Sequence, residues 1–237
     1  MIALIDMDLV VYRCAASSEN EDLSIATHRV EELLDTILTK VQTTEYRAFL
    51  TGATNFRKEV YPEYKANRTQ PKPKWLQECR EYAMKNLWAE LAPDNLEADD
   101  ALAIHQTADT IICSLDKDLL QIEGRHFQWE IQGGPEAKRW SKPDTFITQT
   151  ALEGNRLFYE QCLKGDTSDN VKGVKGLGEA KARKLLAGID NERAMLDVCL
   201  SQYASEEEFL MNAQCLYILR SLDDSYISRY ERLINEV

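Results

Sequence analysis

The chain has few of the residues that build zinc sites. Its 237 residues include only three histidines, all isolated, and six cysteines without a CxxC pair. Zinc-binding motifs depend on such closely spaced pairs, so a zinc site is not expected. We interpret the cysteines as reduced thiols in a cytoplasmic compartment.

Long apolar runs are also absent. The longest, such as MIALI at residues 1–5, fall far short of the roughly 20 residues that a membrane-spanning helix needs. They are also too short for a signal peptide, and no basic segment precedes them. A hydrophobic content of 44% and a charged content of 29% are ordinary for a soluble globular protein. The length suits one large domain, or a main domain with a small one.

Positive charge is scarce overall but concentrated in two segments. The formal net charge is −12, which by itself argues against a nucleic-acid ligand. Residues 57–74 nevertheless hold six basic and two acidic residues, and residues 164–184 hold six basic and three acidic ones. From residue 190 to the end there are ten acids and four bases. The sequence therefore indicates an acidic body with two basic islands.

Apolar runs of strand length alternate with helical patterns in the first half of the chain. We predict strands at 1–8, 46–52 and 110–115, and helices at 24–43, 75–91 and 96–108. We predict a loop with some extended structure at 55–68, a breaker at 69–74, and strands and turns at 125–142, around the GGP at 133–135. This alternation predicts an α/β fold with a parallel sheet, whose ligands bind beyond the carboxyl ends of the strands.

From residue 152 onward the pattern is mostly helical. We predict an α/β nuclease core at residues 1–150, a helix–hairpin–helix region at 151–188 and a helical C-terminal segment at 189–237. No long Pro- or Ser-rich spacer divides them, so we expect the helical part to pack on the sheet. The acidic segment from residue 190 fits a helical cover with a solvated face better than a docking site for a partner protein.

Acidic residues form four clusters, two of them at the ends of predicted strands. Asp6 and Asp8 end the first strand, and Asp116 and Asp118 follow the strand at 110–115. If the first strand continues to residue 8, its two-residue period puts Asp6 and Asp8 on one face. The other two clusters are Glu97, Asp99 and Asp100 in LEADDA, and Asp166 and Asp169 in GDTSDN.

A run of acids is usually a solvated face, and that is the alternative for each cluster. The strand ends of a parallel sheet converge on one crevice, however, and carboxylates gathered there repel one another without a counter-charge. Oxygen-only clusters suit Mg²⁺ or Mn²⁺. Two such ions about 4 Å apart can hold the attacking and the leaving oxygen of a phosphodiester. Spacing alone favours metal-dependent phosphoryl chemistry about as strongly as a solvated surface.

The segment KGVKGLGEAKARKLL at 172–186 predicts a helix–hairpin–helix: a short helix, a turn at 176–178 and a second helix from Glu179. Its glycines let backbone N–H groups approach a phosphate, and its basic side chains add salt-sensitive, sequence-independent contacts. The alternative is a glycine-rich turn before a surface helix. The candidate DNA contacts here are Gly173, Lys175, Gly176, Gly178 and Lys181.

Four motifs, in chain order PEYKANR, LEADDALA, ICSLDKDLLQI and KGDTSDNVKGVKGLGEAKARKLL, resemble the 5′-nuclease family of flap endonucleases and 5′–3′ exonucleases. The resemblance spans roughly residues 1–188. It is strongest to short phage-encoded exonucleases and to the 5′-nuclease domain of bacterial DNA polymerase I. It implies a PIN-like parallel sheet flanked by helices, with a helix–three-turn–helix element and Mg²⁺-dependent hydrolysis that leaves a 5′-phosphate.

The resemblance also implies roles for the acids. A first metal site would draw on residues matching the family's ligands, namely Asp6, Glu97, Asp99, Asp100 and Asp116. A second site would draw on Asp118, Asp166 and Asp169. The hairpin glycines would hold a K⁺ ion that bridges backbone carbonyls to a DNA phosphate.

The first basic island matches phosphate contacts of the same family. Lys65 and Arg68 in YKANR would be catalytic, because they would steer and neutralise the scissile phosphate. Arg57 would contact another phosphate. Tyr64 would stack on an unpaired base, with a packing role as an equal alternative.

The chain departs from the family pattern in two places. Many members carry another aspartate at the end of the second strand, where this chain has TGATNFR and Gly52 or a neighbour stands instead. Our hypothesis is that Asp8 substitutes for it. Only 28 residues separate Arg68 from Glu97, so the arch over the site must be short and a strong preference for long single-stranded flaps is not expected.

Two other classes of function compete with a nuclease of DNA 5′ ends. One is a structure-specific DNA-binding protein that has lost catalysis, as the missing aspartate would permit. The other is a PIN-type ribonuclease. The basic hairpin after residue 170, which is typical of duplex binding, argues against it. We expect a cytoplasmic monomer that binds 5′ ends in duplexes, nicks and flaps and in RNA–DNA hybrids, with a replication protein as a further partner.

Overall fold

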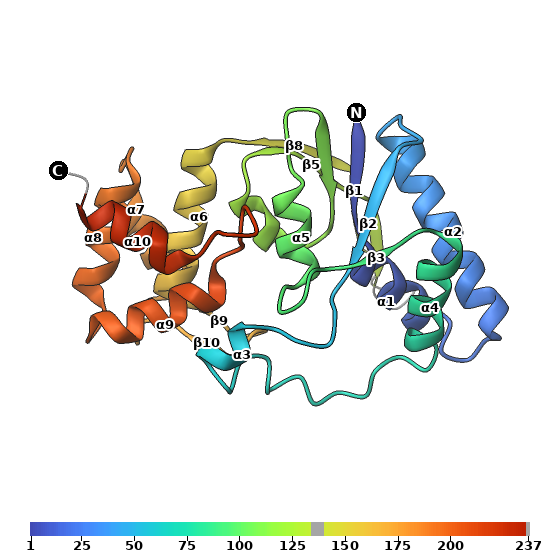
Figure 1. The fold of residues 1–237 in the computed structure, drawn as a ribbon, viewed down its shortest axis with the longest axis horizontal. Coiled ribbons are helices and arrows are strands. Elements are labelled where there is room, and N and C mark those ends of the chain that lie inside the picture. The colour runs from blue at the N-terminus through green and yellow to red at the C-terminus, as the bar shows by residue number, and fades with distance from the viewer. Residues whose placement is uncertain (134–139, 236–237) are drawn as a thin grey trace.

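A six-stranded sheet forms the centre of the molecule. The computed structural model describes residues 1–133 and 140–235, and the strand order is β3-β2-β1-β4-β5-β8 (Figure 1). Neighbouring strands pair in parallel, except that β8 is antiparallel to β5. This sheet, flanked by helices, confirms the predicted α/β class. The strands are β1 (Ile2–Asp6), β2 (Tyr46–Leu50), β3 (Glu90–Leu91), β4 (Thr110–Cys113), β5 (Gly124–Gln128) and β8 (Thr145–Gln149).

Both faces of the sheet are buried, which explains why its strands are almost continuously apolar. In β1, Ala3 and Ile5 belong to one hydrophobic cluster, while Leu4 between them belongs to the other. The first cluster is covered by α1 (Met7–Ser17), α2 (Leu23–Lys40) and α4 (Leu76–Asn86). The second begins with α5 (Ala98–Ile104) and continues into the C-terminal helices.

The C-terminal helices share one core with the sheet. Side chains from all five join the cluster that contains Leu4 and Phe49. In Figure 1 these helices gather at the opposite end of the molecule from α2 and α4, and residues 61–75 run between the two ends as a long irregular connection. The helices are α6 (Ala151–Lys164), α7 (Glu179–Leu186), α8 (Glu192–Gln202), α9 (Glu206–Leu216) and α10 (Tyr226–Asn235).

Several element boundaries differ from the sequence-based predictions. The helix predicted to reach residue 91 ends at Asn86, because Trp88 adopts a left-handed φ of 48° and β3 follows. The first strand ends at Asp6 rather than at Asp8, since α1 begins at Met7. The predicted loop at 55–68 contains one helical turn, α3 (Arg57–Val60).

The segment at 172–186, which we call the glycine–lysine segment, also begins differently from the prediction. In place of a short first helix, β9 (Gly165–Asp166) and β10 (Val171–Lys172) form a small antiparallel hairpin, followed by turns and then α7. A second small hairpin joins β6 (Ile131–Gly133) to β7 (Trp140–Lys142). The GGP turn predicted at 133–135 lies partly outside the described residues.

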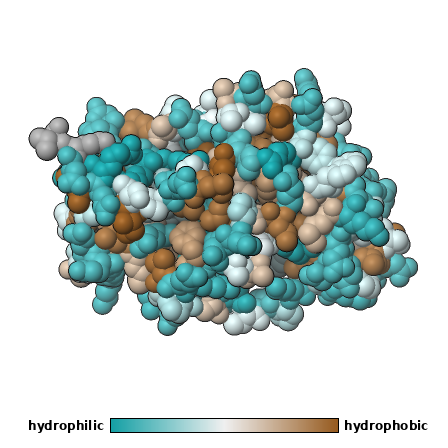
Figure 2. All heavy atoms as spheres, in the orientation of Figure 1, coloured by the Kyte–Doolittle hydropathy of each residue, from teal (hydrophilic) through white to brown (hydrophobic). Residues whose placement is uncertain are grey.

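The visible surface is mostly hydrophilic, with apolar side chains in scattered patches (Figure 2). In the part of the chain that the structure describes, no helix has the length and apolarity needed to cross a membrane.

The contact between α6 and η1 (Lys117–Gln121) tolerates no side chain at Gly154. A Cβ there would lie 2.3 Å from the Gln121 carbonyl oxygen. We predict that Gly154→Ala lowers the free energy of unfolding by about 1–3 kcal/mol, because the two backbones must separate. Urea denaturation measures the change. Gly52→Ala is the control, since its nearest neighbour would be the Ala92 oxygen at 3.9 Å; equal stabilities of the two variants would contradict this account.

Candidate active site

The carboxyl ends of β1 and β4 bring the first acids together. Asp6 ends β1 and is 3% exposed, and it accepts hydrogen bonds from the Ser114 hydroxyl (2.6 Å) and the Leu9 N–H (3.1 Å). The pKa of Asp6 is raised to about 7, chiefly by burial and also by the nearby Asp8 and Asp116, while the hydrogen bonds from Ser114 and Leu9 lower it. Ser114 was missed from the sequence, although a hydroxyl directly after an apolar strand is a usable signal.

The turn after β4 presents two more acids. Asp116 caps the 3-10 helix η1 by accepting from the Asp118 N–H (2.8 Å), and Asp118 accepts from the Gln161 amide (2.6 Å). Burial first, and then neighbouring acids, raise the pKa of both carboxyls, to about 7 for Asp118. Gln161 is a buried polar residue on α6. Its burial, which indicates a functional role, can be recognised only once the position of the helix is known.

The first turn of α5 contributes Glu97 and Asp99. Asp99 lies near Asp6, Asp116 and Glu97, and its pKa is raised well above the usual value by burial and then by these three charges. Glu97 differs because it has cationic partners. Burial alone would raise its pKa, but Lys65 and Arg57 outweigh that effect and lower it.

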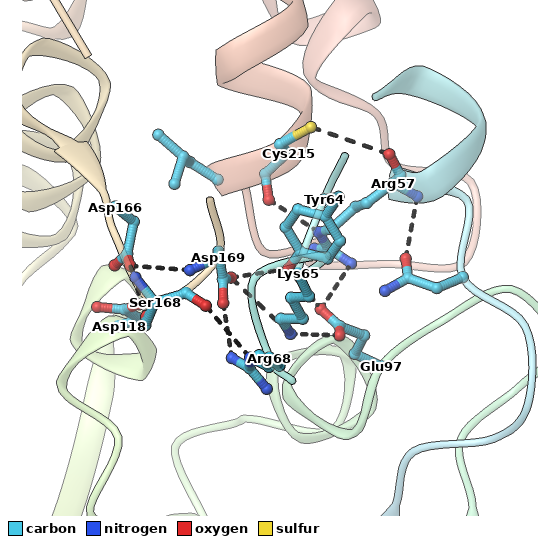
Figure 3. Close-up of polar contacts among 12 residues, drawn as sticks. Arg57, Tyr64, Lys65, Arg68, Glu97, Asp118, Asp166, Ser168, Asp169 and Cys215 are labelled. Atoms are coloured by element: carbon cyan, nitrogen blue, oxygen red, sulfur yellow. Dashed lines mark hydrogen bonds and ion pairs between the residues drawn. The ribbon is translucent and has the colours of Figure 1, made fainter. Parts of the chain in front are cut away.

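Residues 166–170, which we call the acidic loop, supply the last two acids. One Asp166 oxygen, Oδ1, accepts from the Ser168 N–H (2.7 Å), the Ser168 hydroxyl (2.5 Å) and the Asp169 N–H (3.2 Å), and so shapes the loop. Asp169 accepts from Arg68 (2.7 Å) and from the Tyr64 hydroxyl (2.8 Å). Figure 3 shows Asp118, Asp166 and Asp169 on one side of Lys65 and Glu97 on the other.

Residues 63–68, which we call the basic strap, place a cation between α5 and the acidic loop. The Lys65 ammonium lies 2.5 Å from Glu97 Oε1 and 3.8 Å from Asp169 Oδ2, and its side chain is 19% exposed (Figure 3). Arg68 is the more exposed cation, at 56%, and pairs with Asp169. The structure thus brings both predicted catalytic residues to the edge of the carboxylate cluster.

Arg57 does not reach the surface, which corrects its predicted phosphate contact. It is 2% exposed and donates to both oxygens of Asp100 (2.7 and 2.8 Å) and to the carbonyls of Cys215 and Tyr217. Asp100 is fully buried and also accepts from the N–H groups of Glu97 and Leu219. Every oxygen of Asp100 is therefore used within the chain, and its expected role as a metal ligand gives way to a structural ion pair.

Tyr64 and Asp8 also have internal partners. Tyr64 is 3% exposed and its hydroxyl lies 2.9 Å from Glu97, so the packing alternative replaces stacking on a base. Asp8 pairs with Arg80 of α4 and accepts from the Thr51 N–H (2.8 Å). The two-residue strand period does not apply to Asp8, because β1 ends at Asp6. The role of Asp8 as a metal ligand stays a prediction. Its partner Arg80 was not predicted.

The glycine–lysine segment divides into a buried and an exposed part. Gly173 packs against Gly165, where a Cβ would lie 2.2 Å from backbone, so its role is close packing. Gly176 (φ 81°) and Gly178 face open space. Lys175 and Lys181 are exposed, and Lys181 donates to the Gly176 carbonyl (2.9 Å).

A cleft of about 430 Å³ joins this segment to the acids. Its lining includes Asp116, Asp118 and Asp166, together with Gly178 and Glu179 at the start of α7. The end of the turn at 176–178, which we call the glycine turn, and the acids therefore open into one space.

The donor set fits a divalent cation by its chemistry. All the donors are oxygens, and several carry raised pKa values, as expected where buried carboxylates lack a counter-charge. Within residues 1–133 and 140–235, no three acidic, histidine or cysteine side chains converge closely enough to hold an ion as they stand. Lys65, Arg68, Tyr64, Ser114 and Gln161 occupy carboxylate oxygens instead.

Comparison with known proteins decides the family. A model described as the 5′-3′ exonuclease N-terminal resolvase-like domain matches residues 1–150. The chain belongs to the 5′–3′ exonuclease family. A DNA polymerase I from Bacillus caldotenax is 31% identical over 217 residues, which cover 83% of this chain and 24% of that protein. A 5′-3′ exonuclease from Bacillus subtilis is 29% identical over 181 residues, covering 70% of this chain and 60% of the relative. The exonuclease-family chain thus spans about a quarter to three-fifths of these relatives.

Solved structures confirm the PIN-like fold predicted for the exonuclease family. A bacteriophage T5 flap endonuclease in complex with DNA and metal ions matches with a TM-score of 0.67 at 15% identity, over 99% of this chain and 93% of that chain. The catalytic core of Rad2 with a DNA substrate matches with a TM-score of 0.54 at 14% identity, over 100% and 78% of the two chains.

Because the pKa of Asp118 is raised, replacing this carboxylate by a neutral side chain should stabilise the fold, by an amount that depends on pH. The folded protein keeps a proton on Asp118 up to about pH 7, whereas the unfolded chain releases it near pH 4, so the free energy of unfolding falls as pH rises between these values. We predict that Asp118→Asn raises the melting temperature at pH 8 in EDTA by about 2–4 °C, the shift for about 1 kcal/mol in a chain of this size.

The same variant carries its own control. At pH 5 Asp118 is already protonated in the folded state, so Asp118→Asn should then have little effect. An equal shift at both pH values, measured by thermal unfolding, would contradict the assigned cause.

Proposed function

We propose that this chain is a Mg²⁺-dependent 5′ nuclease that hydrolyses phosphodiesters near DNA 5′ ends by a two-metal mechanism. The observation that carries the proposal is the gathering of seven carboxylates at one edge of the sheet, bordered by the basic strap. Four of them have raised pKa values. The seven are Asp6, Glu97, Asp99, Asp116, Asp118, Asp166 and Asp169.

The proposal divides these residues between two ions. Asp6, Glu97, Asp99 and Asp116 would hold one Mg²⁺ or Mn²⁺, and Asp118, Asp166 and Asp169 would hold the other. When bound, such ions supply a nucleophile at neutral pH and neutralise charge on the leaving oxygen. Asp100 is left out because Arg57 satisfies it.

Lys65 and Arg68 supply positive charge at the rim of the cluster. We infer that they bind and orient the scissile phosphate, because donors fixed beside a developing charge lower its energy most in a poorly solvated site. Lys65 suits this task better than Arg68, since it is less exposed and lies nearer Glu97. Both must exchange a carboxylate partner for phosphate when the substrate binds.

The exposed part of the glycine–lysine segment would hold the duplex. Gly176 and Gly178 leave backbone N–H groups accessible to phosphates, and Lys175 and Lys181 add charge. A K⁺ ion on the carbonyls of this turn belongs to the same proposal. The proposed substrates are 5′ ends at nicks, gaps and flaps and in RNA–DNA hybrids, cut by a cytoplasmic monomer that works beside a replication protein.

The decisive experiment compares 5′-labelled nicked duplex, gapped duplex, 5′-flap and RNA–DNA hybrid, each with Mg²⁺, with Mn²⁺ and with EDTA. We expect cleavage with either ion and none with EDTA. Binding without cleavage of any substrate would overturn the nuclease proposal and favour a DNA-binding protein that has lost catalysis.

Lys65→Ala tests the role given to the strap. We expect this variant to lower kcat at least a hundredfold, because a charge next to the scissile phosphate is lost, while the duplex dissociation constant in EDTA changes less than threefold. Lys58→Ala, an exposed lysine on α3, is the control and should retain activity. Parallel losses of cleavage and binding in Lys65→Ala would refute the catalytic assignment.

A further inference from the structure

The basic strap and the acidic loop are fastened together by side-chain amides that touch no carboxylate. The Asn67 amide donates to the Thr167 carbonyl at 2.6 Å. In the other direction, the Asn170 amide donates to the Glu63 carbonyl at 2.9 Å. Each segment therefore contributes one amide to the backbone of the other, near opposite ends of the strap.

A backbone hydrogen bond lies between these two contacts. The Lys65 N–H donates to the Asp169 carbonyl at 2.9 Å. Lys65 and Asn170 both adopt left-handed conformations, with φ of 57° and 59°. Residues other than glycine rarely hold this conformation unless their surroundings impose it. Both residues are hydrogen-bonded to a segment about one hundred residues away in the sequence, Lys65 through its N–H and Asn170 through its amide.

This arrangement fixes where the strap's cations lie. The N–H of Lys65 is bound to the residue whose carboxylate lies 3.8 Å from its own ammonium. A shift of the strap along the loop would therefore move Lys65 away from Glu97 and Arg68 away from Asp169 together. A displacement of about 1 Å at a catalytic group can cost on the order of a hundredfold in rate.

We propose that Asn67 and Asn170 are positioning residues, a reciprocal clamp that sets the register of the basic strap on the acidic loop and thereby places Lys65 and Arg68 for catalysis. The proposal rests on the nuclease function proposed above. The two asparagines act through the strap and have no contact with the reacting phosphate. Asn67 is exposed, so its loss removes little packing.

The kinetic test uses Asn67→Ala and Asn170→Gly, the second because glycine keeps the left-handed backbone without the amide. We expect each variant to lower kcat about tenfold and to leave KM and duplex binding in EDTA within twofold. Asn86→Ala is the matched control, since it removes an exposed amide that donates to the Tyr82 carbonyl, on α4. A loss of duplex binding as large as the loss of kcat would overturn the clamp, because it would make the asparagines DNA contacts.

A double-mutant cycle tests whether the clamp acts through Lys65. In a Lys65→Ala background, Asn67→Ala should lower kcat by less than threefold, because the cation that it positions is gone. A full tenfold further loss would overturn the proposed route.

Hydrogen exchange measures the clamp without any cleavage. The Lys65 N–H should exchange at least fivefold faster in Asn67→Ala than in the native chain, and unchanged in Asn86→Ala. Unchanged exchange in Asn67→Ala would overturn the clamp whatever the nuclease assay gives. Faster exchange in a chain that cuts no substrate would leave the clamp standing and remove the nuclease function instead.

Discussion

Repulsion among carboxylates is the constraint on which the rest of the site depends. Burial raises the pKa of Asp6, Asp99, Asp116 and Asp118 at the sheet edge, and the neighbouring acids raise each pKa further. Burying charges of one sign is unfavourable without an opposite charge beside them. The basic strap supplies such charge at the rim, and Arg57 supplies it behind Glu97. The acids are therefore held together by the sheet and the helix ends, against their own electrostatic energy.

One buried ion pair organises the structure behind the acids. Arg57 and Asp100 join α3 to the first turn of α5, and the carbonyls of Cys215 and Tyr217 bring in the end of α9. The pair holds the pKa of Asp100 below its usual value despite full burial. Removing one partner from such a pair typically costs about 3–5 kcal/mol. Asp100 of the LEADDALA motif and Arg57 of the first basic island thus pair with each other, and this pair holds Glu97 and the chain that leads into the basic strap in place.

The sequence predicted the fold class and the meeting of the acids at two strand ends, because the strand ends of a parallel sheet converge, whereas Glu97, Asp99, Asp166 and Asp169 were assigned to the site through the family resemblance. Asp6 and Asp116 follow from that rule alone. It did not predict which charges pair. Arg57 and Lys65 are both basic residues of one island, yet one is buried and the other borders the cluster, since tertiary packing decides this. Likewise, Asp8 depended on where β1 ends, and a one-residue change from strand to helix at Met7 alters the direction of its side chain.

The local fold explains why the acidic loop leads directly into the glycine–lysine segment in an acidic protein. Asp166 and Asp169 shape the acidic loop through backbone bonds, and β9 and β10 return the chain so that Gly173 packs on Gly165. This tight return places the glycine turn and the start of α7 in the cleft that the acids line. Because only a few residues separate the two parts, the β9–β10 hairpin sets their spacing. A phosphodiester chain lying in this cleft would meet the acids and the glycine turn at a fixed separation, so the hairpin itself would define the distance from duplex contact to scissile bond.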